Sequence, residues 1–166
     1  MYKNQPDVHI ADSLNNLGVV YSSKGAYDHA IDHYRQAVEI YRKVYKNQPH
    51  PHIARSLSNL GVVYDKKGAY DHALECLHQA LEMHKKVYKN QPHPHIASSL
   101  NNLGVVYHNK GAYDQALACY HQALPIFTDR LGVDHPHTQK VKSNIAEVQH
   151  LGSQALLTAG LAYLAS

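Results

Sequence analysis

Three pairs of histidines have a spacing with which imidazole side chains could bind a metal ion, since imidazole is a common ligand of zinc and copper. The pairs are His50 with His52, His93 with His95, and His135 with His137. Each pair surrounds a proline, and no carboxylate or cysteine recurs beside the pairs. We therefore interpret them as residues at helix starts and predict neither a metal site nor a cofactor. A metal-dependent role is the third of three hypotheses for this chain.

The other reactive side chains do not form a catalytic motif. Cys76 and Cys119 occupy the same place in two successive repeats, and the 13 tyrosines recur at fixed positions such as Tyr21, Tyr64 and Tyr107. Such recurrence indicates packing, with the tyrosine hydroxyls at the rim. The sequence has no glycine-rich phosphate loop, no nucleophile elbow and no H-E-x-x-H motif. We predict that the chain is not an enzyme.

The composition is that of a soluble chain with enough apolar residues for a packed domain, since 44% of the 166 residues are hydrophobic. The net charge is +3 and the basic residues are scattered, whereas nucleic-acid binding requires a basic patch or stripe. The first residues lack a secretory signal, and the apolar letters ALLTAGLAYLA near the C-terminus are too few to cross a bilayer. With only two cysteines, these features predict a cytoplasmic protein that binds neither nucleic acid nor membranes.

A repeat of 43 residues organises the chain, because Tyr2, Tyr45 and Tyr88 each open the letters YKNQP. A fixed period of this size is typical of stacked helix-pair repeats. We expect a single domain over residues 1–166. Its parts are expected at about 2–44, 45–87 and 88–131 (three units), 135–151 (the degenerate first helix of a fourth unit) and 153–165 (a capping or interaction helix).

The apolar spacing within a unit predicts two helices. Leu14, Leu17 and Tyr21 would lie on one face of a first helix. The letters from Ala30 onward repeat this spacing in a second helix. Gly25 falls where the first helix must end and suits a left-handed cap, and a glycine stands at the equivalent place in the next two units.

Local signals also predict how the helices begin and cross. Pro51 is expected to be the first residue of a helix capped by His50, and in the first unit Asp7 stands at the cap position. Pro125 predicts a kink or an interruption in the second helix of the third unit. Small residues would allow each pair of helices to approach closely. They are Gly18, Gly61 and Gly104 on the first helices, and Ala30, Ala73 and Ala116 on the second.

The pattern of Leu14, Leu17, Gly18 and Tyr21, followed by Gly-x-Tyr-x-x-Ala, resembles the tetratricopeptide repeat. Leu14 stands where the common form has Trp, Arg42 stands where it often has Pro, and the unit is nine residues longer than the usual 34. Long units with LNNLG and a terminal LGVDHP resemble the kinesin light chain branch of this family. The resemblance implies an all-α fold, a right-handed superhelical solenoid of antiparallel helix pairs.

In the tetratricopeptide family the first helices line a concave surface that binds partners. The resemblance places on this surface Asn15, Asn16, Arg55, Asn59, Val62, Lys66, Asn101, Asn102, Val105, His108, Lys140 and Asn144. Four of these residues, Asn16, Asn59, Asn102 and Asn144, form what we call the asparagine ladder. A carboxamide both donates and accepts hydrogen bonds, so the ladder could pair with the backbone of an extended peptide, as the resemblance to kinesin light chains implies. Alternatively, each amide bonds to the adjacent helix and fixes the packing register.

Two further hypotheses of function therefore stand beside the metal-dependent one. The first is a protein-interaction scaffold whose concave groove captures a peptide from a partner protein. Because Arg55, Lys66 and Lys140 are opposed there by Asp12 and Asp65, only a weak preference for acidic peptides is expected. The second is a structural role, in which the apolar C-terminal helix docks on a neighbouring copy and the repeat module self-associates into a homo-oligomer.

Overall fold

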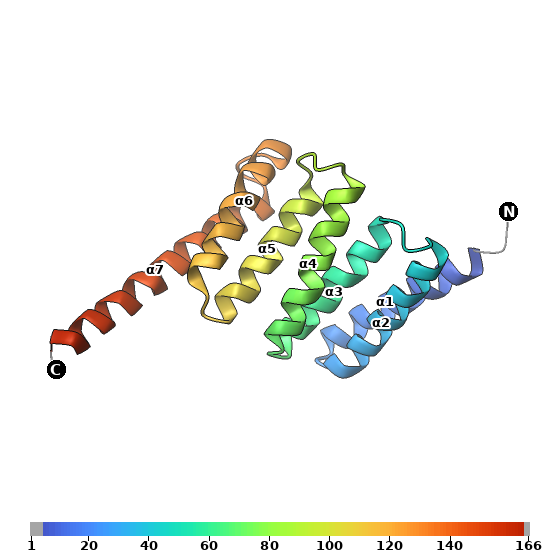
Figure 1. Cartoon of the computed structure of the whole chain (residues 1–166), viewed down its shortest axis with the longest axis horizontal. Helices are drawn as coiled ribbons and strands as arrows, with labels where there is room; N and C mark the ends of the chain where they lie inside the picture. The colour runs from blue at the N-terminus through green and yellow to red at the C-terminus, as the bar shows by residue number, and fades with distance from the viewer. Residues whose placement is uncertain (1–4, 165–166) are drawn as a thin grey trace.

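Helices joined by short turns make up the part of the chain that the structure describes. The computed structural model describes the backbone of residues 5–164 and the side chains of residues 7–154. Its helices follow one another along the molecule (Figure 1) as α1 (Gln5–Ser23), α2 (Tyr27–Val44), α3 (Pro51–Lys66), α4 (Tyr70–Val87), α5 (Pro94–Asn109), α6 (Tyr113–Leu131) and α7 (Pro136–Leu164). The predicted all-α solenoid of helix pairs is confirmed.

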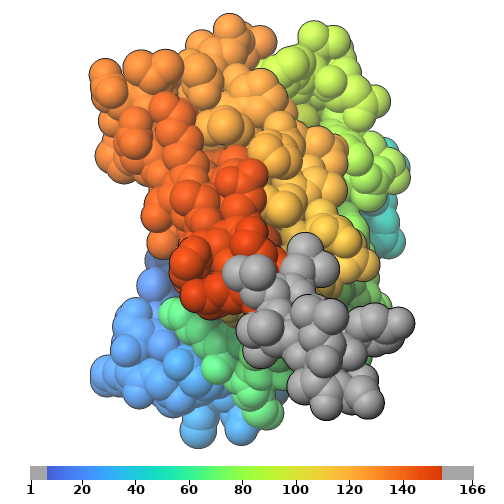
Figure 2. All heavy atoms as spheres, turned by 90° about the vertical axis from the view of Figure 1, so that its left-hand side faces the viewer, coloured from blue at the N-terminus to red at the C-terminus, as the bar shows by residue number. Residues whose placement is uncertain are grey.

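The first helices of the units lie closer together than the second helices do. Each helix contacts the next one along the chain, and α1, α3, α5 and α7 also contact one another in succession. Within the described residues, the backbones of α2, α4 and α6 do not approach one another as closely. A stack that is closer on one side curves toward that side, so the first helices line its concave face. The end-on view in Figure 2 shows the N-terminal unit (blue) below α6 (orange), so the units do not lie in a straight row.

Glycine ends each first helix, as the sequence predicts. Gly25, Gly68 and Gly111 have φ angles of 74°, 79° and 80°, a left-handed conformation that glycine adopts without steric cost. The turn after the second helix uses residues other than glycine. Lys46 and Asn47 have φ angles of 51° and 57°, and the equivalent residues of the next unit repeat them. This second left-handed turn has no glycine to mark it and was not predicted from the sequence.

A histidine caps the next first helix. The Nδ1 atom of His50 accepts a hydrogen bond from the backbone N–H of His52 at 3.2 Å, and a proline is the first residue of α3. His93 and His135 accept the equivalent bond at the starts of α5 and α7, also at 3.2 Å. The predicted histidine caps are thus confirmed. The predicted cap at Asp7 is wrong, because α1 already begins at Gln5 and Asp7 lies in its first turn.

The close crossing of the helix pairs requires the predicted small residues. A Cβ atom at Gly104 would lie 2.4 Å from Cε1 of Tyr120, and one at Gly61 would lie 2.6 Å from Cγ of Leu77. Real Cβ contacts are not that short, so neither position admits a side chain without rearrangement. The facing alanines of the second helices are completely buried, and they are Ala30, Ala73 and Ala116.

The interruption predicted at Pro125 does not occur, because α6 is continuous from Tyr113 to Leu131. Proline removes one backbone hydrogen bond from a helix interior. Ala123 and Phe127 are buried on either side of it, and their packing offsets this loss.

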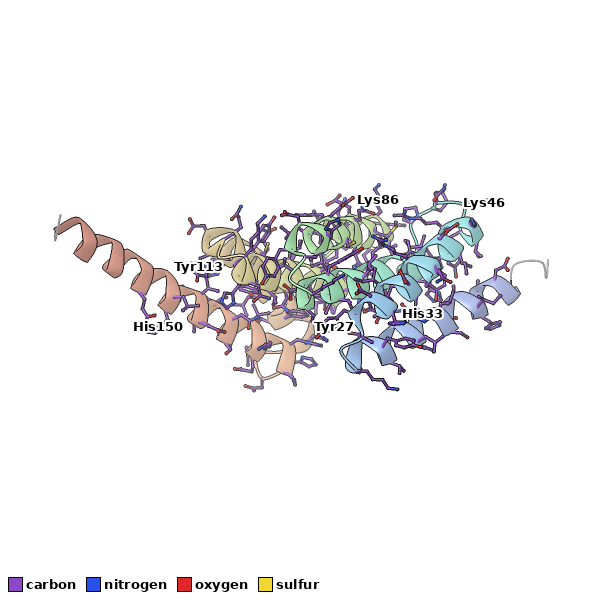
Figure 3. All side chains as sticks on the ribbon, turned by 90° about the horizontal axis from the view of Figure 1, so that it is seen from below. Tyr27, His33, Lys46, Lys86, Tyr113 and His150 are labelled. Atoms are coloured by element: carbon purple, nitrogen blue, oxygen red, sulfur yellow. The ribbon has the colours of Figure 1, made fainter. Side chains whose placement is uncertain are left out.

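The C-terminal helix α7 is longer than predicted. Its backbone is helical from Pro136 to Leu164, so the expected division into segments 135–151 and 153–165 is wrong. A single glycine at position 152 costs a helix only about 1 kcal/mol, which is too little to end it. The helix projects beyond α6 in Figure 1, and His150 points away from the other helices in Figure 3. The capping role predicted for 153–165 falls almost entirely outside the described side chains.

No helix in the described part of the chain combines the length and the apolarity needed to cross a bilayer.

Candidate functional site

The predicted groove residues all lie on the first helices, but they differ in exposure. The exposed residues are Asn16, Arg55, Lys66 and Lys140. The half-buried residues are Asn59, Val62, Asn101, Asn102, Val105 and His108, and the buried residues are Asn15 and Asn144. The concave face therefore offers a central row of half-buried side chains with cations around it. Asn15 and Asn144 are not open on this face, because both are covered by the neighbouring helix.

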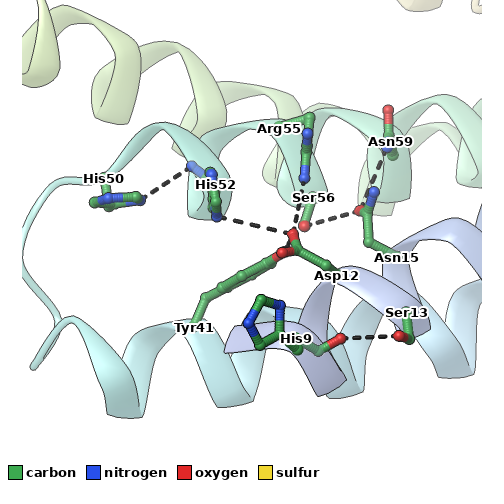
Figure 4. Close-up of polar contacts among 10 residues, drawn as sticks. All are labelled: His9, Asp12, Ser13, Asn15, Tyr41, His50, His52, Arg55, Ser56 and Asn59. Carbon is green, nitrogen blue, oxygen red and sulfur yellow. Dashed lines mark hydrogen bonds and ion pairs between the residues drawn. The ribbon is translucent and has the colours of Figure 1, made fainter. Parts of the chain in front are cut away.

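Asn15 joins α1 to α3. Only 4% of its surface is exposed, and its Oδ1 atom accepts a hydrogen bond from the Oγ hydroxyl of Ser56 at 2.9 Å. The Nδ2 group of Asn59 donates to the same oxygen at 3.5 Å (Figure 4). We call such a contact between two neighbouring first helices a seam. At this seam the amides connect one unit to the next.

The seam between α5 and α7 repeats this arrangement. The Nδ2 group of Asn144, which is 5% exposed, donates to Oδ1 of Asn101 at 3.1 Å. Each of the two seams thus pairs an asparagine of one unit with a ladder asparagine of the next. In both, the carboxamide oxygen of the earlier unit is the acceptor. For Asn59 and Asn144 this geometry agrees with the alternative in which the amides fix the packing register. Asn16 and Asn102, by contrast, make no side-chain hydrogen bond within the described residues.

A second polar cluster at the α1–α3 seam centres on Asp12 (Figure 4). The Tyr41 hydroxyl donates a hydrogen bond to Oδ1 of Asp12, and the Arg55 guanidinium lies 3.4 Å from the same oxygen. His52 Nδ1 is 3.9 Å away. Burial, and then the bond to Asp12, raises the pKa of Tyr41 above its ordinary value. The opposition of Asp12 and Arg55 was expected from the sequence, whereas the bond from Tyr41 was not. Asp12 has no counterpart in the other units, where Arg55 and Ser98 stand.

The seam between α3 and α5 contains a cavity of about 190 Å³. Most of the residues that line it carry a hydroxyl, amide or imidazole group; they are Pro51, His52, Arg55, Ser58, Asn59, His84, His95, Ser98, Ser99 and Asn102. Three of these residues, Arg55, Asn59 and Asn102, belong to the predicted groove. The cavity therefore opens among the residues that the resemblance places on the binding surface.

His84 forms the buried side of this cavity. It is 6% exposed, its Nδ1 atom lies 2.8 Å from Oγ of Ser99, and its ring stacks on His95 with 5.5 Å between ring centroids. Burial, together with the nearby His95 and His93, lowers the pKa of His84 to about 4. The imidazole is therefore neutral at pH 7, and the cavity has no buried charge.

A larger cavity of about 440 Å³ lies on the second helices, outside the predicted groove. Arg35, Arg42 and Lys43 of α2 surround an apolar floor that includes Leu57. Arg42 Nη2 donates to Oε1 of Gln79 at 3.0 Å, which connects α2 to α4 across the opening. This cavity was not predicted from the sequence, although basic residues seven and eight positions after Arg35 share one face of a helix.

The histidine pairs have a structural explanation, since the first member of each pair caps a helix. Within the described residues, no group of three or more histidine, cysteine, aspartate or glutamate side chains could hold a metal ion.

Comparison with known protein families agrees with the repeat pattern seen in the sequence and in the structure, over most of the chain. Profiles of the tetratricopeptide repeat match residues 9–86 and residues 96–137. The chain belongs to the tetratricopeptide repeat family. The family supports a protein-interaction scaffold in general, and its fold is typically non-enzymatic. A comparison with curated protein sequences gave no match.

Several solved structures share the fold. BtubC (BKLC) from P. vanneervenii is 23% identical with a TM-score of 0.77, over 86% of this tetratricopeptide repeat chain and 56% of BtubC. A kinesin light chain-like protein of Podosopora anserina, with nearly identical TPR-like repeats, is 21% identical with a TM-score of 0.71, over 98% of this chain and 75% of its own. The N-terminal domain of stress-induced protein-1 from C. elegans is 18% identical with a TM-score of 0.61, over 83% of this chain and 96% of its own. At such identities these structures are similar in fold alone.

Proposed function

We propose that this tetratricopeptide repeat protein binds an extended peptide of a partner protein on its concave face. The observation that supports this proposal is the row of half-buried side chains on α3 and α5. This row includes Asn102 and Val105 and adjoins the 190 Å³ cavity. Apolar valines and free carboxamides together suit a peptide, whose backbone needs both donors and acceptors. We further propose that the chain belongs to the long-repeat, kinesin light chain-like branch of the family, because its units have 43 residues and its fold is similar to that of the Podosopora anserina structure.

The test is to select peptides from a random display library on the immobilised protein and to measure their affinity by fluorescence anisotropy. The double variant Asn16→Ala with Asn102→Ala removes two amides that make no hydrogen bond within the described residues. We expect about tenfold weaker binding, which corresponds to about 1.4 kcal/mol. The matched control is Gln36→Ala with Gln115→Ala, two exposed positions on second helices. Equal binding by the groove variant, or an equal loss in the control, would contradict the proposal.

A second candidate function is self-association through an uncovered apolar face of α1. Ile10, Leu17 and Val20 are 52%, 44% and 48% exposed. Their equivalents one unit later are at most 5% exposed, because α2 packs against α3 there; they are Ile53, Leu60 and Val63. The face on α1 thus has the shape and apolarity that a helix from a neighbouring copy could cover.

We expect Leu17→Glu and deletion of residues 153–166 each to lower the mass found by light scattering, if the C-terminal helix of one copy covers α1 of another. The control Val133→Glu charges an equally exposed residue, at 52%, outside both surfaces. A mass that neither change alters excludes this role.

A further inference from the structure

Two of the three seams between first helices share one arrangement of hydrogen bonds, and the third seam departs from it. At the α1–α3 seam the carboxamide oxygen of Asn15 accepts bonds from Ser56 and Asn59. At the α5–α7 seam the carboxamide oxygen of Asn101 accepts a bond from Asn144. The earlier unit therefore supplies an acceptor oxygen, and the later unit supplies the donors.

At the α3–α5 seam a shorter side chain takes the place of this asparagine. Ser58 stands one repeat after Asn15 and one repeat before Asn101. Ser99 and Asn102, the equivalents of the donors Ser56 and Asn59, are present. No hydrogen bond of the described side chains joins Ser58 to either of them, and the 190 Å³ cavity lies between the three. The α3–α5 seam therefore has the two donor residues, Ser99 and Asn102, but lacks the carboxamide oxygen that would accept their hydrogen bonds.

We propose that the cavity between α3 and α5 is a subsite for the carboxamide side chain of an asparagine or glutamine in the bound partner segment. This proposal rests on the proposed function, since the side chain is delivered by a peptide on the concave face. The partner's carboxamide takes the place that Asn15 and Asn101 fill at the flanking seams. Its oxygen accepts from Ser99 and Asn102, and its NH2 group donates to the Ser58 hydroxyl.

The chemistry of the lining favours a neutral carboxamide over a carboxylate. His84, the imidazole beneath the cavity, is neutral at pH 7 because its pKa is about 4. With a proton on Nδ1 it donates to Ser99, whose own hydroxyl proton is then directed to the ligand oxygen. The one permanent cation of the lining, Arg55, already faces Asp12 at 3.4 Å. A buried carboxylate would therefore lose its hydration without gaining an unpaired cation.

The first test fills the cavity from within the chain and needs no ligand. In Ser58→Asn the new carboxamide can pair with Asn102 as Asn15 pairs with Asn59. One added hydrogen bond without a new buried charge is expected to raise Tm by about 2–4 °C. The matched variant Asn101→Ser removes the acceptor from the α5–α7 seam and is expected to lower Tm by a similar amount. A lowered Tm in Ser58→Asn shows that the cavity does not accept a carboxamide and overturns the proposal.

The second test uses pools of acetylated nonapeptides whose central residue is fixed as Asn, Gln, Asp, Glu or Ala while the others are randomised. We expect the Asn or Gln pool to bind the wild type at least about fivefold more tightly than the Ala and Asp pools, since one hydrogen bond contributes about 1 kcal/mol. Ser58→Asn should abolish this preference while it still binds the pools at the affinity of the Ala pool.

The outcomes separate the subsite from the groove. If no pool binds the wild type, the proposed function fails and the subsite fails with it. If the pools bind but show no preference, or if Ser58→Asn keeps the preference, the groove stands and the subsite is wrong. A preference for the Asp and Glu pools, lost in Ser58→Asn, would show a carboxylate subsite instead and contradict the assignment to a carboxamide.

Discussion

Replacing His84 by phenylalanine should reduce the loss of stability that occurs as the pH falls below 7. The ordinary pKa of histidine is about 6.5, and burial lowers the pKa of His84 to about 4 in the folded chain. Between these values the unfolded chain binds a proton that the folded chain does not, so stability falls as the pH falls. At about 1.4 kcal/mol for each pH unit, linkage gives a loss of about 2 kcal/mol between pH 7 and pH 5, and about 3 kcal/mol in total.

The third unit shows that phenylalanine suits this position. Phe127, one repeat after His84, is 2% exposed and stacks on His137 with 5.4 Å between centroids, much as His84 stacks on His95. The measurement is urea unfolding followed by circular dichroism at about pH 7 and about pH 5. The other histidines are common to both proteins, so the difference between wild type and variant isolates His84. We expect the wild type to lose about 2 kcal/mol more than His84→Phe over this range. Equal losses would refute the assignment of a neutral buried imidazole.

Two further substitutions test the packing of the units by the same unfolding assay. Gly104→Ala should destabilise by about 1–3 kcal/mol because its Cβ would lie 2.4 Å from a tyrosine ring, whereas Gly152→Ala, with nothing within 4 Å, should be neutral or stabilise by up to about 1 kcal/mol. Asn15→Ala should cost about 1–3 kcal/mol because it leaves a buried serine hydroxyl without its acceptor, whereas the exposed Asn16→Ala should change stability by less than about 0.5 kcal/mol. A reversed order within either pair would show that the packing or the seam is misassigned.

The helix ends could be predicted from the sequence because their signals are local. Gly25 has the left-handed conformation, and His50 caps the next helix beside a proline. Each signal acts within a few residues of its own position. The predictions that proved wrong concern helices whose ends depend on residues that are distant in sequence but close in space. Pro125 does not interrupt α6, because buried side chains on both sides of it hold the helix in place.

The roles of the asparagines could be predicted only in part. The sequence identifies the ladder and offers two alternatives for it, peptide binding or packing register. It does not show which residue faces which across a seam, because that depends on the rotation of one unit against the next. Asn15 and Asn144 proved to be buried for this reason. The change from Asn15 to Ser58 is visible in the sequence, but its meaning appears only when Ser58 is found beside a cavity.

Peptide binding on the concave face can be observed residue by residue by NMR, when the isotope-labelled protein is titrated with a library-selected peptide. We expect chemical shifts to change on the concave face, at Asn16, Ser58, Asn102 and Val105, while those of Arg35 and its neighbours around the cavity on the second helices stay unchanged. Changes confined to the surroundings of Arg35, with the four concave positions unaffected, would contradict this expectation.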